Sequence, residues 1–174
     1  MKIPLILSIV AILLVFSCKE NTKKKPFSID PNKIAEPLKT FNHEMVGVED
    51  QQIDDYLTRR AWNMIKTQSG LRYFIYKAGN GLTPKAGQIV VLDYSIGLIR
   101  GEEIYNSKND GKKIFRVDQT EEISGLHELV KYLKVGDCVK AVIPSYLAYG
   151  LVGDEKKIPN KATLIFDLQL KEIR

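Results

Sequence analysis

The most constraining feature of the chain is a strictly alternating segment near its end, at residues 162–173. Four apolar side chains are separated from one another there by single, mostly polar residues: Leu164, Phe166, Leu168 and Leu170. Because successive side chains of a β-strand point to opposite faces, this period of two predicts a strand with one buried and one mostly solvated face. Such strands are typical of an antiparallel sheet that is covered on one side.

Shorter segments of the same kind precede it. We predict strands at residues 71–77, 88–100, 102–106, 114–117 and 138–143, with a bend or bulge at Gly97. Ser124 is expected to cap a helix at about 124–134, whose apolar face comprises Leu126, Leu129, Val130 and Leu133. One short helix among so many strands predicts the α+β class, with an antiparallel β-sheet wrapped around one short α-helix.

A second, N-terminal amphipathic helix is predicted at residues 49–64. Its apolar positions recur at helical spacing and are Ile53, Tyr56, Leu57, Ala61 and Met64. Acidic residues occupy its first turn, where the helix dipole favours them. The apolar stripe packs either on the chain's own domain, which we favour, or on a partner.

The beginning of the chain has the pattern of an export signal. Residues 3–15 are apolar except for Ser8 and follow the basic Lys2. A run of this length suits the hydrophobic region of a signal peptide and falls short of the roughly 20 residues that span a membrane. The run ends at Ser17-Cys18, which resembles the cleavage site of bacterial lipoproteins, whose cysteine carries the lipid. The alternatives are an ordinary secretory signal with an incidental cysteine and a retained anchor helix.

This interpretation divides the chain into four parts. We predict a lipoprotein signal peptide at 1–17, a tether or linker at 18–48, the N-terminal helix at 49–69 and an independently folding domain at 70–174. The linker prediction rests on the lysine-rich stretch at 19–26 and on two prolines without sustained periodicity at 27–48. The lysines of the tether either contact anionic lipid headgroups or keep a spacer soluble, and we favour the spacer.

Several kinds of chemistry have no residues to support them. The 26 basic residues are mixed with 21 acidic ones, which is not the clustered charge of a nucleic-acid-binding protein. His127-Glu128 lacks the second histidine of a helical zinc motif, and we expect His127 on the helix surface. Phosphate-loop and serine-hydrolase motifs are absent from the sequence. We therefore expect no metal and no cofactor.

The second half of the chain carries motifs in a specific order. Ala148-Tyr149-Gly150 precedes a stretch at 158–167 that reads IPNKATLIFD, and Ile123-Ser124-Gly125-Leu126 precedes both. Over about residues 70–174 this set resembles the FKBP-type peptidyl-prolyl isomerases. Together with the N-terminal signal, the architecture resembles the gliding-motility-associated FKBP lipoproteins.

The resemblance implies a cup for the substrate proline made of aromatic and aliphatic side chains. The matching positions are Tyr94, Tyr105, Ile123, Leu126, Tyr149, Ile158 and Phe166. The Ile123 N–H and the Tyr149 hydroxyl would hold substrate carbonyl groups. The catalytic set implied by the resemblance also includes Asn106.

This sequence departs from the family pattern in four places. Tyr105-Asn106 stands where the family has Phe-Asp, Leu126 replaces a tryptophan, and Asp154 replaces a histidine. The fourth is a basic residue of the family that has no clear counterpart at 108–111.

The resemblance and its departures leave two main hypotheses for the function and one minor one. The first is an active prolyl isomerase, because an apolar cup disfavours the planar X–Pro amide while hydrogen bonds hold the twisted one. The second is a peptide-binding or chaperone module that is weakly catalytic or inactive, and a different enzyme or a structural lipoprotein is the third possibility. The expected partners are proline-containing polypeptides, the membrane through lipidated Cys18, and other envelope or motility proteins. The expected location is the bacterial cell envelope, on the outer membrane facing the periplasm.

Overall fold

The computed structural model describes residues 31–174, with side chains from residue 43 onward. The predicted signal peptide, Cys18 and the first part of the predicted tether lie outside the described residues. Residues 39–174 form one compact unit. Within the described part of the chain, no helix has the length and apolar character needed to cross a membrane.

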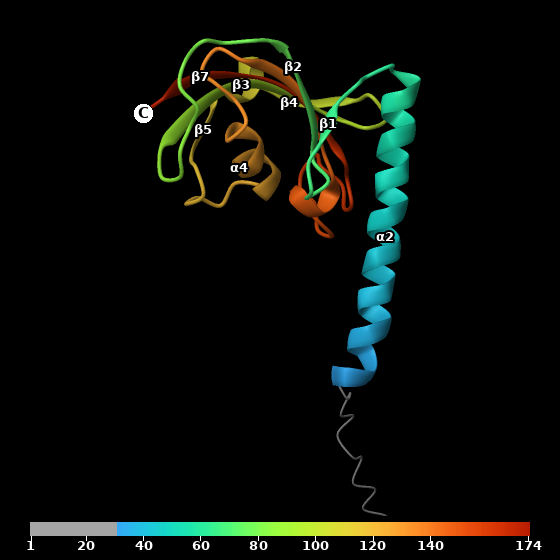
Figure 1. The fold of residues 1–174 in the computed structure, drawn as a ribbon. Helices are drawn as coiled ribbons and strands as arrows, with labels where there is room; N and C mark the ends of the chain where they lie inside the picture. Colours follow the sequence, from blue (N-terminus) through green and yellow to red (C-terminus); the bar gives the residue numbers. More distant parts are fainter. Residues whose placement is uncertain (1–30) are drawn as a thin grey trace, which may run out of the picture. The chain divides into compact units, whose positions relative to one another are not determined.

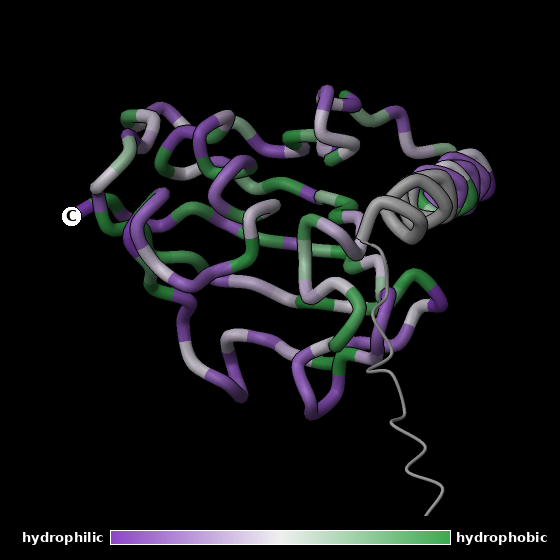
Figure 2. The backbone as a smooth tube through the Cα atoms, turned by 90° about the horizontal axis from the view of Figure 1, so that it is seen from below, coloured by the Kyte–Doolittle hydropathy of each residue, from purple (hydrophilic) through white to green (hydrophobic). Residues whose placement is uncertain are grey.

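The core of the unit is one antiparallel sheet (Figure 1). Its strands are β1 (Ile65–Lys66), β2 (Arg72–Lys77), β3 (Ile89–Leu98), β4 (Glu103–Asn106), β5 (Lys113–Arg116), β6 (Cys138–Ile143) and β7 (Leu164–Ile173). They are hydrogen-bonded in the order β1-β2-β6-β7-β3-β4, and β5 also pairs with β3. The alternating segment of the sequence is therefore a central strand, β7, between β6 and β3. Figure 2 shows hydrophobic stretches along the central runs of the chain, whereas many of the turns at its edges are hydrophilic.

The alternation in β7 is confirmed. Leu164, Phe166, Leu168 and Leu170 are at most 2% exposed, and the residues between them are partly accessible. The predicted irregularity of β3 is also confirmed, because its register against β4 shifts between Ile96 and Gly97. β3 and β7 are each ten residues long, and they pair with each other over nearly their whole length.

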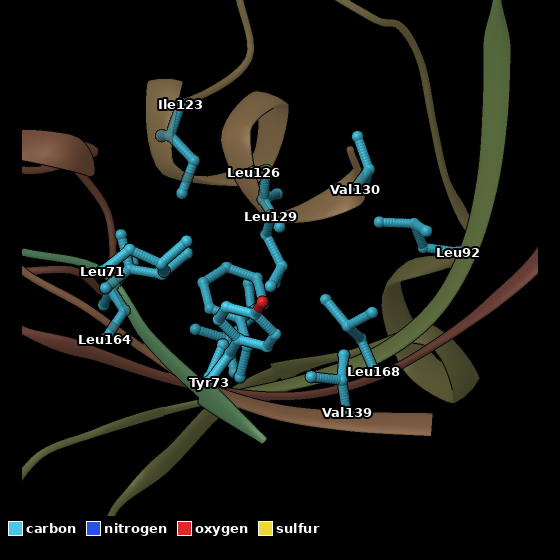
Figure 3. Packing of buried hydrophobic residues seen from close by; sticks show 14 of the residues in the cluster. Leu71, Tyr73, Leu92, Ile123, Leu126, Leu129, Val130, Val139, Leu164 and Leu168 are labelled. Atoms are coloured by element: carbon cyan, nitrogen blue, oxygen red, sulfur yellow. The ribbon is translucent and has the colours of Figure 1, made fainter. Parts of the chain in front are cut away.

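The short helix predicted inside the sheet is α4 (Ser124–Val130). Leu126, Leu129 and Val130 are fully buried and point from the helix toward the sheet (Figure 3). Three details of the prediction were wrong. The helix ends at Val130 rather than at about residue 134, and Ser124 is its first residue rather than the cap, with its hydroxyl group donating to the Leu147 carbonyl at 3.3 Å. His127 is buried rather than on the surface, and its Nδ1 accepts the Asp118 N–H at 3.0 Å.

The N-terminal helix is longer than predicted at its start and shorter at its end. It is α2 (Pro31–Arg59), so it begins inside the predicted linker and stops before residues 61–69. Pro31 lies in the first turn, where a helix has no use for its N–H group, and proline there does not argue against a helix. The helix ends before Ala61, whose positive φ of 52° is incompatible with a continued right-handed helix.

The apolar stripe of α2 packs on the chain's own unit, as we favoured. Ile53, Tyr56 and Leu57 are buried in a cluster with Val142 of β6. Beside this cluster, the guanidinium group of Arg72 is 1% exposed and bonds Asp50 and Asp54 of the helix at 2.6 and 2.8 Å. The boundary predicted at residue 70 therefore falls between segments that pack against each other.

Candidate functional site

The residues expected to form the cup come from five places in the fold. Tyr94 lies on β3, Tyr105 on β4, Ile123 and Leu126 at the start of α4, Tyr149 and Ile158 in the segment between β6 and β7, and Phe166 on β7. All belong to or pack against one hydrophobic cluster. The antiparallel pairing of β3 with β7 sets Tyr94 opposite Leu168, near Phe166. The fold thus gathers these seven residues although they are spread over more than 70 positions of sequence.

The aliphatic members and Phe166 are part of the core. Ile123, Leu126, Ile158 and Phe166 are 8, 0, 3 and 1% exposed, so little of their surface is accessible to a ligand. The side chains that remain partly accessible are the three tyrosines. The candidate site is therefore a rim of tyrosine rings above a closed apolar floor.

The tyrosine hydroxyl groups are held in their protonated form. Burial, followed by the nearby charges of Glu122 and Asp154, raises the pKa of Tyr149 to about 12. Burial, with Asp110 and Glu122 nearby, also raises the pKa of Tyr94. At neutral pH these groups are hydrogen-bond donors, which is the form needed to bind a peptide carbonyl.

Asp154 connects β4 to the segment that carries Tyr149. The Tyr105 hydroxyl group donates to Oδ2 of Asp154 at 2.6 Å, while Oδ1 accepts the N–H groups of Ile158 and Lys156 at 2.7 and 3.0 Å. This bond to Asp154, with burial, raises the pKa of Tyr105 to about 12. Burial works to raise the pKa of Asp154, but the hydrogen bonds that it accepts outweigh this and lower the pKa below its usual value.

Lys157 adds to the same connection. Its ammonium group donates to the Ile104 carbonyl at 3.1 Å and lies 4.8 Å from the centre of the Tyr105 ring. The residues predicted from the resemblance did not include Lys157, and Asp154 was noted only as a departure from the family. Aspartate side chains commonly accept backbone N–H groups of the next few residues in a turn, which is the only local signal for Asp154, and its bond to Tyr105 has none.

Glu122 engages the N–H group that the resemblance assigns to substrate binding. Its Oε1 accepts the Ile123 N–H at 3.0 Å, and its Oε2 bonds the Lys113 ammonium group at 2.8 Å. The Lys113 nitrogen lies 5.6 Å from the centre of the Tyr94 ring, so a basic side chain does reach the site, from β5. No local pattern predicts the Lys113–Glu122 contact, because it depends on β5 lying near the start of α4.

The Asn106 side chain is used locally. Its Oδ1 accepts the N–H groups of Lys108 and Asn109, both at 3.0 Å, and caps the one-turn helix α3 (Ser107–Asp110). Its Nδ2 donates to Glu103 at 2.8 Å. The stretch that follows β4 is therefore a capped helical turn. The hydrogen bonds of Asn106 go to β4 and α3 and not to the tyrosine rim.

The described side chains form no group of three or more histidine, cysteine or carboxylate residues suited to a metal ion. The polar groups at the site are instead hydroxyl groups, backbone N–H groups and paired charges. An arrangement of this kind binds and orients a peptide through hydrogen bonds.

Comparison with known proteins gives a consistent result. Residues 81–171 match the family model described as FKBP-type peptidyl-prolyl cis-trans isomerase. The chain is 41% identical over 112 residues to FKBP-type peptidyl-prolyl cis-trans isomerase FkpA of Escherichia coli (strain K12), an alignment that covers 63% of this chain and 40% of FkpA. It is 37% identical over 131 residues to FkpA of Aeromonas hydrophila, covering 73% of this chain and 48% of that protein.

Solved structures are also similar. The crystal structure of FkpA from Escherichia coli superposes with a TM-score of 0.63 at 28% identity, covering 100% of this chain and 84% of that one. The crystal structure of AtFKBP13 gives a TM-score of 0.61 at 26% identity over 64% of this chain and 99% of that one. The chain spans less than half of the length of the curated relatives quoted above.

Proposed function

The chain belongs to the family of FKBP-type peptidyl-prolyl cis-trans isomerases, and on this premise we propose that it isomerises X–Pro bonds in polypeptides during their folding. The observation that carries the proposal is the rim of three protonated tyrosines above an apolar floor, at positions that match the family motif. The substrates are proline-containing polypeptides of the cell envelope.

The proposed mechanism uses binding alone. Rotation about an X–Pro bond meets a barrier near 20 kcal/mol and takes about 10–100 s without a catalyst. The planar amide is conjugated and well solvated, so an apolar site disfavours it relative to the twisted amide. The Tyr149 hydroxyl group and the Ile123 N–H hold the substrate carbonyl groups while the bond turns. Substrate entry requires Glu122 to release the Ile123 N–H.

The test is the catalysed isomerisation rate of a Leu-Pro or Phe-Pro peptide, measured for the wild type and two variants. Tyr149→Phe keeps the ring and loses one donor, so the fold should persist while the rate falls. Phe166→Ala removes a side chain that is 1% exposed and should cost about 3–5 kcal/mol of stability as well as activity. Normal catalysis by both variants in their folded state would place the site elsewhere.

A second function has one observation in its favour. The buried floor and the occupied Ile123 N–H are also what a peptide-binding chaperone module with little catalysis would have. Binding of proline peptides without any acceleration of their isomerisation would support this alternative.

We also propose that the protein is a lipid-anchored envelope lipoprotein similar to those associated with gliding motility, on the outer membrane facing the periplasm. The support is the sequence pattern that ends at Cys18. The test is membrane partitioning of a Cys18→Ser variant. We expect this variant either to become soluble or to keep its uncleaved signal peptide. A variant that still partitions fully after signal removal would contradict the anchor.

A further inference from the structure

One carboxylate on helix α2 binds both ends of the segment that carries Tyr149. This segment, residues 145–163, leaves β6 at its start and enters β7 at its end, and it includes Asp154 and Ile158. Oε1 of Glu49 accepts the Ser145 N–H and the Thr163 hydroxyl group, both at 2.6 Å. Its Oε2 accepts the Ser145 hydroxyl group at 2.8 Å.

The three donors belong to buried residues, so losing the Glu49 carboxylate would leave them without an acceptor. Ser145 is 8% exposed and Thr163 is 6% exposed, so water has little access to replace a lost partner. A carboxylate only accepts hydrogen bonds, and its two oxygens suit three donors that converge from the two ends of one connecting segment, just after β6 and just before β7. Leaving such donors unpaired costs more than the bond itself contributes.

A chain of backbone hydrogen bonds continues from this contact toward the site. The Gly150 N–H donates to the Ser145 carbonyl at 2.8 Å, and the Lys161 N–H donates to the Gly150 carbonyl at 2.8 Å. Gly150 directly follows Tyr149, so the two ends of the segment and the base of the tyrosine are linked within a few bonds. A shift of Ser145 would therefore move the backbone that orients the Tyr149 ring.

The helix that supplies Glu49 is itself fixed. Ile53, Tyr56 and Leu57 are buried one to two turns further along α2, and Asp50 and Asp54 bond the buried Arg72. Glu49 thus projects from a rigid support, and it lies outside the residues 81–171 that match the family model.

From this geometry we propose that Glu49 is a positioning residue for the isomerase site, acting through the 145–163 segment. The inference rests on the proposed function, because it assumes that Tyr149 contacts the substrate. The helix before the domain then contributes to substrate affinity without touching the substrate.

The experiment compares Glu49→Ala, Glu49→Gln and the control Asp54→Asn in the full chain. Asp54→Asn weakens the attachment of the same helix, at Arg72, without contacting the 145–163 segment. The readouts are hydrogen exchange at the Gly150 and Lys161 amides, thermal stability, and KM and kcat for a proline peptide. All variants are compared below their unfolding temperatures.

We expect Glu49→Ala to accelerate exchange at both amides and to raise KM about tenfold, because the Tyr149 hydroxyl group would no longer be held in one position for the substrate. Glu49→Gln keeps an oxygen that accepts from Ser145 and Thr163, so it should restore most of the wild-type behaviour. Asp54→Asn should lower stability and leave KM and the two amides unchanged.

Two results would overturn the proposal: equal effects of Glu49→Ala and Asp54→Asn on KM, or unchanged exchange at Gly150 and Lys161 in Glu49→Ala. If Glu49→Ala fails to fold, Thr163→Val removes one end of the contact and provides the same test. A wild type without isomerase activity would defeat the proposed function alone. In that case the exchange data still decide whether Glu49 orders the segment.

Discussion

The Tyr105 hydroxyl group donates a hydrogen bond of 2.6 Å to Asp154, although the two residues are 49 positions apart. The bond joins the end of β4 to the segment that carries Tyr149, across the rim of the candidate site. Two residues outside the 145–163 segment therefore hold it. Tyr105 binds it near its middle, and Glu49 binds it at both ends.

The Tyr105–Asp154 bond should show energetic coupling. Tyr105→Phe keeps the ring and removes the donor, and Asp154→Ala removes the acceptor. We expect each variant to destabilise the protein and the pair to be less than additive by about 1 kcal/mol, because the groups are partly exposed. A double-mutant cycle by denaturant unfolding measures this coupling. Strict additivity would mean that the bond contributes nothing in solution.

The stability of the protein and its isomerisation rate should change little with pH near neutrality, and the stability should fall at both acidic and alkaline pH. The pKa of Asp154 is lowered in the folded state, so its contribution to stability is complete above about pH 4 and is lost as the pH falls through the folded pKa. The pKa values of Tyr105 and Tyr149 are raised to about 12, so their contribution is complete below about pH 10 and is lost as the pH rises.

The measurements are stability by denaturant across pH, tyrosinate absorbance, and isomerisation rates from about pH 5 to 8. Tyr105→Phe serves as the control, since it should remove one late-titrating tyrosine. A bell-shaped rate profile in the neutral range would indicate acid–base catalysis and contradict the mechanism.

Glu122→Gln should improve peptide binding. The carboxylate holds the Ile123 N–H in the free protein, and an amide oxygen is a weaker competitor because charge-assisted bonds are about twice as strong. We expect a lower KM with a smaller effect on kcat. Glu121→Gln is the matched control, one position earlier on an exposed residue. An increase of KM in Glu122→Gln would show that the carboxylate assists binding instead.

Asn106→Asp should leave activity nearly unchanged. The family pattern has aspartate at this position, and the resemblance taken by itself favours a gain of activity when aspartate is restored. In the structure the Asn106 oxygen caps α3, a role that aspartate also fills, but Nδ2 donates to Glu103 and a carboxylate cannot. We expect a small loss of stability from repulsion with Glu103, measured by thermal unfolding. A clear gain in isomerisation rate would restore the catalytic role predicted from the resemblance.

The sequence predicted the sheet better than the site. Alternation along β7 identified the buried face, and the spacing of Leu126, Leu129 and Val130 identified the helix that covers it. These signals are local, since each depends on the period of one element. The contacts of Asp154, Glu122 and Glu49 join residues from different elements, and no period or spacing announces them.

The error at α2 has a related cause. Two prolines and the lack of a sustained period argued for a linker before residue 49, yet the helix starts at Pro31. Proline in a helix interior removes one hydrogen bond and its ring clashes with the carbonyl group of the preceding turn, but neither penalty applies at Pro31, which lies in the first turn. The apolar spacing that does predict a helix appears only where α2 packs on the domain, from Ile53 onward.

Arg72 limits how the domain can be reused as a module. Its guanidinium group is 1% exposed, lies on β2, and finds its two carboxylate partners on α2. A chain cut at residue 70, or the domain grafted onto another protein, would lose both counter-ions together with the helix that packs beside this guanidinium group. Val142, which is 0% exposed in the same cluster as the helix, would lose its apolar cover. We therefore expect a domain exchanged between relatives to keep more of its stability when it carries the helix together with the sheet.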